Sequence, residues 1–288
     1  MQQALTGVRV VDMALLLPGA LAATWLADLG ASVVRVEPPW GGGVIGWDNS
    51  GPDPYFTAMR SNKELVRLNV RRPEEAQRLR ALIQDADILI EGYRPGTLAG
   101  RGFGYAALRA LNPRLIYCSI SGFGQSGERR GQAAHDNNYL ALAGLLDRNR
   151  GRDGVPHLLP VQLADVGGGT YPALVAILAA LYARERSGHG QHLDVAIFDG
   201  ALAWNYFNIP AQPFDELESR GLGLGLLTGE SLCYNVYECA DGRYLTLGAL
   251  EPRFWRNVCE LLERPDLLPF AANPPPGAAE RLAEFRAL

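Results

Sequence analysis

The sequence has few of the residues that build metal centres or disulfide frameworks. Its 288 residues include only four cysteines and four histidines. The cysteines form no C-x-x-C pair, and no histidine stands beside them at metal-ligand spacing. We therefore expect reduced, mostly buried thiols and a cytoplasmic protein. These cysteines are Cys118, Cys233, Cys239 and Cys259.

The sequence also lacks a strong excess of charge of either sign. The formal net charge is −4, and among 27 basic residues only Lys63 is a lysine. A mildly acidic chain of this kind argues against nucleic acid or an anionic membrane as its main partner. Hydrophobic residues make up 48% of the chain, which is enough for a folded core.

Long hydrophobic runs are missing as well. Residues 1–14 contain no basic stretch followed by an apolar one, so we expect no signal peptide. The longest apolar run covers residues 171–183, whereas a membrane span needs about 20 residues. This run predicts a buried helix, and we expect no membrane insertion.

Strand-like and helical patterns alternate along the first part of the chain. The β-rich runs cover residues 8–13, 32–36, 65–70, 87–91 and 115–120; helical stretches cover 20–29 and 105–111, and Pro73 opens another. The alternation predicts an α/β fold with a doubly wound, mainly parallel sheet. No G-x-G-x-x-G follows the first strand and no P-loop is present, which excludes both nucleotide fingerprints. A glycine-rich loop, residues 121–131, follows the fifth strand, where ligands of such sheets bind.

The pattern changes near residue 200. A helix after residue 165 and a strand at 192–198 complete a large Rossmann-like domain, residues 1–200, and residues 201–225 read as a linker. A hairpin then follows, with strands at 233–239 and 244–247 around Asp241-Gly242, and a helix at 254–262. These elements predict a small α+β domain over residues 226–288.

Three residues are candidates for acid–base or nucleophilic chemistry. His135 suits proton transfer near neutral pH, or it is a hydrogen-bonded residue at a helix start. Asp165 is a natural helix N-cap. It also precedes Gly167-Gly168-Gly169, and glycines are accepted in a helix where something approaches the backbone closely. The helix dipole would favour its anion, as a base or nucleophile needs. Glu251 reads as a helix-start acid.

Other side chains are candidate ligand contacts. Four arginines are candidates for phosphate contacts, and four aromatic residues are expected in the wall of a ligand pocket. The arginines are Arg35, Arg71, Arg94 and Arg101; the aromatic residues are Trp40, Trp47, Trp204 and Phe207.

Several long motifs, in order from residue 7 to residue 255, resemble the class III CoA-transferase family. The family includes formyl-CoA transferases and α-methylacyl-CoA racemases. The opening motif is GVRVVDMALLLPGALAATWLADLGASVVRVEPP, followed by ADILIEGYRPG, NPRLIYCSISGFGQSG and ARERSGHGQHLDVAIFDG. AHDNNYLALAG, LADVGGG and ECADGRYLTLGALEPRFW resemble the racemase branch in particular.

The resemblance implies a role for each matching residue. It makes His135 and Asp165 the catalytic pair, with Glu251 in contact with the histidine. Coenzyme A contacts are implied in three segments: Leu68, Asn69, Val70 and Arg71; Tyr93 and Arg94; and Ala134 with Asp136, Asn137, Asn138 and Tyr139. The resemblance also implies an interlocked homodimer, an acyl-CoA substrate of fatty acid metabolism, and no cofactor beyond the CoA moiety of that substrate.

The implied activity is racemisation of 2-methylacyl-CoA thioesters through an enolate. The alternative is transfer of CoA between carboxylic acids through an acyl anhydride on Asp165. Pro38 replaces an arginine and Asn69 an aspartate that racemases often carry, and the loop at 38–59 looks more like the transferase branch. Family members usually continue for several tens of residues, so a third reading is a non-catalytic CoA binder that lacks this returning segment. The acyl group stays open among branched fatty, sterol-derived and polyketide-like chains.

Overall fold

The computed structural model describes residues 3–40, 54–151, 154–206, 227, 229, 231–271 and 284–285. The chain divides into two compact units, Met1–Trp204 and Asn205–Leu288. The predicted linker at 201–225 begins inside a helix, α8 (Ile197–Ala203), because the apolar run that follows the last strand of the sheet continues as helix. Most of the remaining linker lies outside the described residues.

The first unit is built on a parallel sheet of six strands in the order β3-β2-β1-β4-β5-β6. The predicted doubly wound α/β fold is thereby confirmed. The chain runs outward from β1 on both sides, so the order reverses between β1 and β4. The strands are β1 (Arg9–Met13), β2 (Ser32–Glu37), β3 (Glu64–Arg67), β4 (Ile88–Glu91), β5 (Ile116–Ser121) and β6 (His192–Ala196).

Two strand predictions were too long. The third strand ends at Arg67 rather than residue 70, because Asn69 forms a turn in which its side-chain oxygen accepts the N–H of Arg71. The last strand ends at Ala196, because Ile197 already begins α8.

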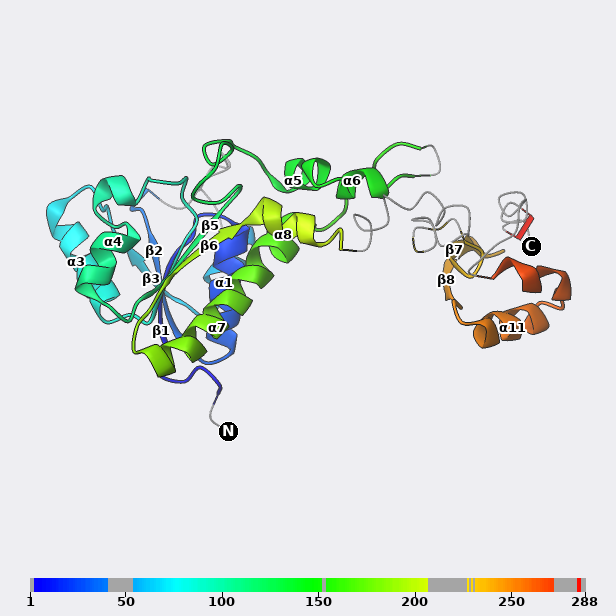
Figure 1. Ribbon diagram of the computed structural model, residues 1–288, viewed down its shortest axis with the longest axis horizontal. Helices are drawn as coiled ribbons and strands as arrows, with labels where there is room; N and C mark the ends of the chain where they lie inside the picture. Colours follow the sequence, from blue (N-terminus) through cyan, green and yellow to red (C-terminus); the bar gives the residue numbers. More distant parts are fainter. Residues whose placement is uncertain are drawn as a thin grey trace. The chain divides into compact units, whose positions relative to one another are not determined.

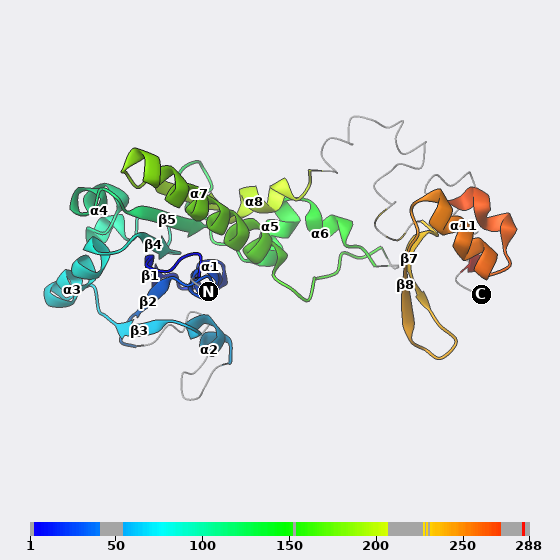
Figure 2. The same cartoon turned by 90° about the horizontal axis from the view of Figure 1, so that it is seen from below.

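Helices cover both faces of this sheet (Figures 1 and 2). On one face lie α1 (Leu17–Asp28) and α7 (Tyr171–Ser187), on the other α3 (Pro73–Gln84) and α4 (Tyr105–Leu111). Because neighbouring strand residues point to opposite faces, Val10 joins the core beneath α1 and Val11 the core beneath α3. A short helix, α2 (Pro54–Arg60), packs beside α1.

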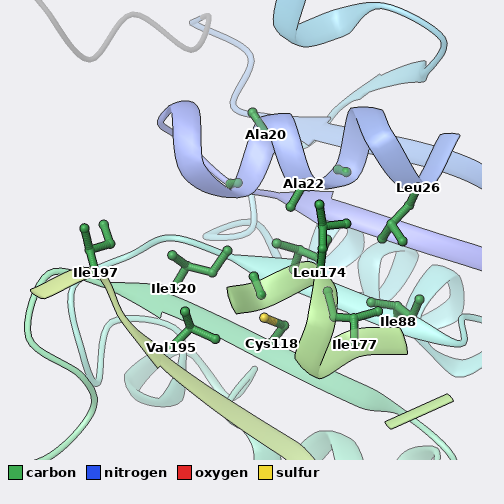
Figure 3. Packing of buried hydrophobic residues seen from close by; sticks show 14 of the residues in the cluster. Ala20, Ala22, Leu26, Ile88, Cys118, Ile120, Leu174, Ile177, Val195 and Ile197 are labelled. Carbon is green, nitrogen blue, oxygen red and sulfur yellow. The ribbon is translucent and has the colours of Figure 1, made fainter. Parts of the chain in front are cut away.

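Small side chains let α1 lie close to the sheet. Ala20, Ala22 and Leu26 are fully buried, and Figure 3 shows Ala22 and Leu26 pointing from α1 toward Leu174 and Ile88. Cys118 lies in the same cluster. It is one of the four cysteines, all of which are free thiols, as expected.

The helix that contains α7 is longer and more exposed than predicted. It begins with a π-helix, η2 (Ala164–Thr170), and the continuous stretch Ala164–Ser187 is long and apolar enough to cross a membrane by length and composition. Ala173, Leu174 and Ile177 on this helix are buried in the core of the first unit. Its outer face carries exposed apolar side chains: Tyr171, Val175, Leu178 and Tyr182.

The second unit contains the predicted hairpin and helix. An antiparallel pair, β7 (Tyr234–Glu238) and β8 (Tyr244–Gly248), precedes α11 (Pro252–Leu261) and the short helix η3 (Pro265–Phe270). Trp255 is buried between α11 and η3, where its indole N–H donates to the Leu267 carbonyl over 3.0 Å. The predicted small α+β unit is confirmed by these elements.

Candidate active site

A cavity of about 400 Å³ lies at the carboxyl ends of the strands where the strand order reverses. Its walls come from the β1–α1 turn, the turn after β4 and the loop after β5. The loop residues include Ser121, Gly122 and Arg130, so the glycine-rich loop lines this cavity as its position predicted.

His135 and Asp165, the two predicted catalytic residues, both line this cavity. They come from different elements, since His135 precedes α5 (Asp136–Leu142) and Asp165 lies in η2. Asn138 fixes the histidine backbone, because its side-chain oxygen accepts the His135 N–H over 3.0 Å. Tyr139 donates its hydroxyl proton to the Ala134 carbonyl over 3.1 Å and so holds the preceding residue.

Asp165 lies inside a helix rather than at its N-cap. The helix begins earlier than predicted, with Leu163 at the N-cap, so Asp165 lies inside the first turn of η2. Burial, and after it the carboxylate of Asp136, raises the pKa of Asp165 to about 7. Burial and the Asp136 charge therefore outweigh the preference for the anion that was expected from the helix dipole. A carboxyl group with this pKa exchanges protons readily near neutral pH.

The glycine triplet is explained by helix packing and not by a ligand. A Cβ on Gly168 would lie 2.5 Å from the Ile197 carbonyl oxygen and 2.6 Å from the Ala201 nitrogen, both in α8. A Cβ on Gly167 would meet the ring of Trp204 at 2.9 Å. The partner that approaches this backbone closely is α8, which fixes the turn that carries Asp165.

This packing makes a testable prediction for stability. Gly168→Ala is expected to destabilise the first unit by roughly 1–3 kcal/mol, because both neighbouring atoms are backbone and cannot move aside. Urea unfolding followed by circular dichroism measures the change. Gly131→Ala is the matched control, since a Cβ there meets nothing within 4 Å. Equal stability of the two variants would contradict the prediction.

The turn after β4 contributes the predicted contacts Tyr93 and Arg94 to the cavity. The buried carboxylate of Glu91 accepts the Tyr93 N–H over 2.8 Å and fixes the start of this turn. Burial raises the pKa of Glu91, although hydrogen bonds from Ser119 and the Tyr93 N–H act in the opposite direction.

The other implied CoA contacts divide into two groups. Ala134 and Tyr139 line the cavity with His135, whereas their neighbours Asp136, Asn137 and Asn138 are outside its lining. The segment Leu68–Arg71 is also outside it. Leu68 is buried in the core beneath α3, and the Asn69 N–H donates to the Glu75 carboxylate over 2.6 Å.

Several expected ligand contacts have other surroundings. Arg35 is 2% exposed and pairs with Asp12 and Glu37, so it does not offer its charge to a phosphate on the surface. Neither Trp40 nor Trp204 lines the cavity. Trp47 and Phe207 lie outside the described residues.

Leu15 and Leu16 of the β1–α1 turn also line the cavity, and this turn was a sequence-based candidate for stabilising an enolate oxygen. Sequence reasoning missed Pro18, at the start of α1, and Gln132, which both line the cavity as well.

Glu251 lies in the second unit, where it is the exposed N-cap residue of α11. Its implied contact with His135 stays a prediction. Within the described residues, no group of three or more histidine, cysteine, aspartate or glutamate side chains is arranged to hold a metal ion.

The fold and site define a doubly wound α/β protein with a histidine and a carboxyl group of raised pKa at the switch point of its sheet. The model of CoA-transferase family III matches residues 5–287, and the chain belongs to this family. It is 36% identical to human alpha-methylacyl-CoA racemase over 253 residues, which cover 88% of this chain and 63% of that protein. It is 32% identical to succinyl-CoA–D-citramalate CoA-transferase of Chloroflexus aurantiacus over 268 residues, 91% of this chain and 66% of that protein.

Solved structures agree with this assignment. A CaiB/BaiF family protein from Brucella suis superposes with a TM-score of 0.80 at 29% identity, covering 100% of this chain and 77% of that one. Rv3272 from Mycobacterium tuberculosis gives a TM-score of 0.82 at 29% identity, over 99% and 77% of the two chains. The chain thus spans about 63% of the human racemase and about three quarters of these solved chains.

Proposed function

We propose that the protein racemises 2-methylacyl-CoA thioesters by removing and returning the proton α to the thioester carbonyl. The observation that carries the proposal is that His135 and Asp165 line one cavity from two different elements, and that the pKa of Asp165 is about 7. Inversion of a carbon acid requires two acid–base groups, one to remove the proton and one to return it on the opposite face.

In the proposed reaction one group acts as base and the other as acid. Neutral His135 takes the α-proton of one stereoisomer, the electron pair moves into the carbonyl to give an enolate, and protonated Asp165 returns a proton from the opposite face. For the other stereoisomer the roles exchange. A pKa near 7 lets Asp165 hold or release its proton at physiological pH. Backbone N–H groups of the β1–α1 turn are candidates for stabilising the enolate oxygen.

The remaining roles rest on resemblance and are proposed with the reaction. Glu251 would orient His135 and favour its charged form. Tyr93 and Arg94 would contact the coenzyme, and the substrate would bring the only CoA that the chemistry needs. We further propose a cytoplasmic homodimer, which light scattering after size-exclusion chromatography would test.

CoA transfer is the second candidate, because the relatives include transferases as well as racemases. The Asp165 carboxylate would attack the thioester carbonyl and expel CoA thiolate, giving a mixed anhydride. An incoming carboxylate would then attack the Asp165 carbonyl of the anhydride and expel the donor acid as its carboxylate. CoA thiolate would attack the acyl carbonyl of the new anhydride, which gives the new thioester and releases the Asp165 carboxylate. This route gives His135 no proton to transfer, so the histidine favours racemisation.

Proton NMR in D₂O separates the two reactions. The substrate is (R)-2-methylacyl-CoA, first without any acceptor acid. Loss of the α-proton signal together with growth of the (S) isomer is the expected result. If the proton stays and acyl exchange begins only when a free carboxylic acid is added, the protein is a transferase. A folded protein that does neither with several acyl chain lengths would overturn both candidates.

A further inference from the structure

Asp136 connects the two candidate catalytic residues directly. It follows His135 in the chain and is the first residue of α5. Its carboxylate oxygen Oδ1 accepts the backbone N–H of Asp165 over 2.9 Å, across 29 residues of sequence. The position of Asp165 is therefore tied to the position of His135 by one hydrogen bond.

Asp136 also brings a negative charge close to Asp165. Its side chain is only partly exposed, and Asp165 is partly buried, so water screens their repulsion less than it would on an open surface. The like charge disfavours ionisation of Asp165 and adds to the effect of burial on its pKa.

The other charged and titratable groups around Asp165 come from different elements. His135 and Tyr139 face the cavity from α5, Arg130 from the loop before it, and Tyr93 and Arg94 from the turn after β4. The pKa of Tyr139 is raised to about 12 by burial and by Asp165, so this phenol stays neutral. The lining residues from α1 and α8, Pro18, Gly19 and Ile197, carry no charge.

We infer that Asp136 is a positioning residue, which holds the backbone of Asp165 beside His135 and whose negative charge favours the protonated form of the Asp165 carboxyl group. The inference deepens the proposed function and rests on it for the role of Asp165 as catalytic acid. Its two parts are separable, because the hydrogen bond needs only an acceptor oxygen whereas the retained proton needs the negative charge.

Two substitutions separate these parts. Asp136→Asn keeps a side-chain oxygen for the Asp165 N–H but removes the charge. Asp136→Ala removes both. We expect ¹³C NMR of proteins labelled at aspartate carboxyl carbons to give an Asp165 titration about one pH unit lower in Asp136→Asn. The Asp165→Asn spectrum identifies the resonance. The pH optimum of α-proton exchange should move toward acid by a similar amount.

Asp136→Ala should show the same acid shift and, in addition, a kcat lower than that of Asp136→Asn, since the Asp165 backbone is no longer held. The control is Asp147→Asn, in α6 (Leu145–Arg148). It removes an equal charge from the exposed ion pair that Asp147 forms with Arg150, and it should leave the Asp165 titration unchanged.

The titration is independent of which reaction the protein catalyses. An acid shift of the Asp165 titration in Asp136→Asn supports the inference even if the D₂O experiment shows no inversion, in which case only the proposed function fails. An Asp165 titration unchanged in Asp136→Asn, with the protein folded, would overturn the inference.

Discussion

Asp165→Ala is expected to abolish both inversion and acyl transfer, whereas His135→Ala is expected to abolish inversion only. Asp165 is the base or acid of one mechanism and the nucleophile of the other, but His135 has a proton to move only in racemisation. Loss of a positioned acid–base group lowers a rate by roughly 10²–10⁴-fold. NMR in D₂O measures exchange, and a separate assay with an acceptor acid measures transfer.

Two matched variants outside the cavity serve as controls. His189→Ala changes an exposed histidine in the turn after α7, and Asp199→Ala changes an exposed aspartate in α8. Neither residue lines the cavity. Both variants should keep the wild-type rate. If His135→Ala kept the wild-type rate of inversion, the histidine would not be the proton-transfer group and the racemase proposal would fail.

Most of the first unit was predictable from local patterns. The apolar runs around Val10, Val33 and Leu89 are short and bounded by turn residues. Such runs predict strands reliably here because the central strands of a parallel sheet are buried on both faces and are therefore apolar throughout. The right-handed crossover rule then left few topologies. Boundaries were less predictable where a side chain redirects the backbone, as Asn69 does after β3.

The site was predictable in its residues but not in its electrostatics. The motifs identified His135 and Asp165, and both line the cavity. The sequence gives no information on burial of Asp165 or on the charge of Asp136 beside it, because these residues are 29 positions apart and meet only through the packing of η2 on α5. The reason for the glycine triplet was equally hard to predict, because its close neighbour, α8, follows about 30 residues later in the chain.

For charged residues inside strands, too, tertiary contacts decide whether the side chain is buried or exposed to a ligand. Arg35 was a candidate phosphate contact because arginines outside a core are usually exposed. It lies instead in a buried cluster with Asp12, Glu37 and Lys63, the only lysine of the chain. Burial acts against the charge of Arg35, but Asp12 and Glu37 outweigh it and raise the pKa of the guanidinium group.

Asp12→Ala is expected to destabilise the first unit by about 3–5 kcal/mol, because it leaves two buried cations without their shared carboxylate. Asp12 is fully buried and accepts hydrogen bonds from Arg35 Nη1 and Lys63 Nζ, each over 2.9 Å. Its other oxygen accepts the Ala14 N–H over 2.9 Å, at the turn that leads into the cavity wall. Urea unfolding at pH 7 measures the loss. The control is Glu185→Ala, which breaks the exposed pair with Arg114 and should change stability by less than about 1 kcal/mol.

The pH dependence and a second substitution identify the cause. Burial already lowers the pKa of Lys63, with Asp12 acting in the opposite direction, so loss of Asp12 should lower that pKa further. A lysine whose pKa is lower in the folded than in the unfolded protein reduces stability fully at pH values below its folded pKa. This loss of stability disappears as the pH rises from the folded pKa to the pKa in the unfolded chain, about 10.4. The stability lost in Asp12→Ala should therefore shrink between pH 7 and pH 10.

Adding Lys63→Met to Asp12→Ala should restore part of the stability at pH 7, although Lys63→Met alone should be destabilising because it leaves Asp12 with one fewer cation. If the double variant were as unstable as the sum of the two single variants, the loss would come from the Ala14 turn and not from the unpaired charges.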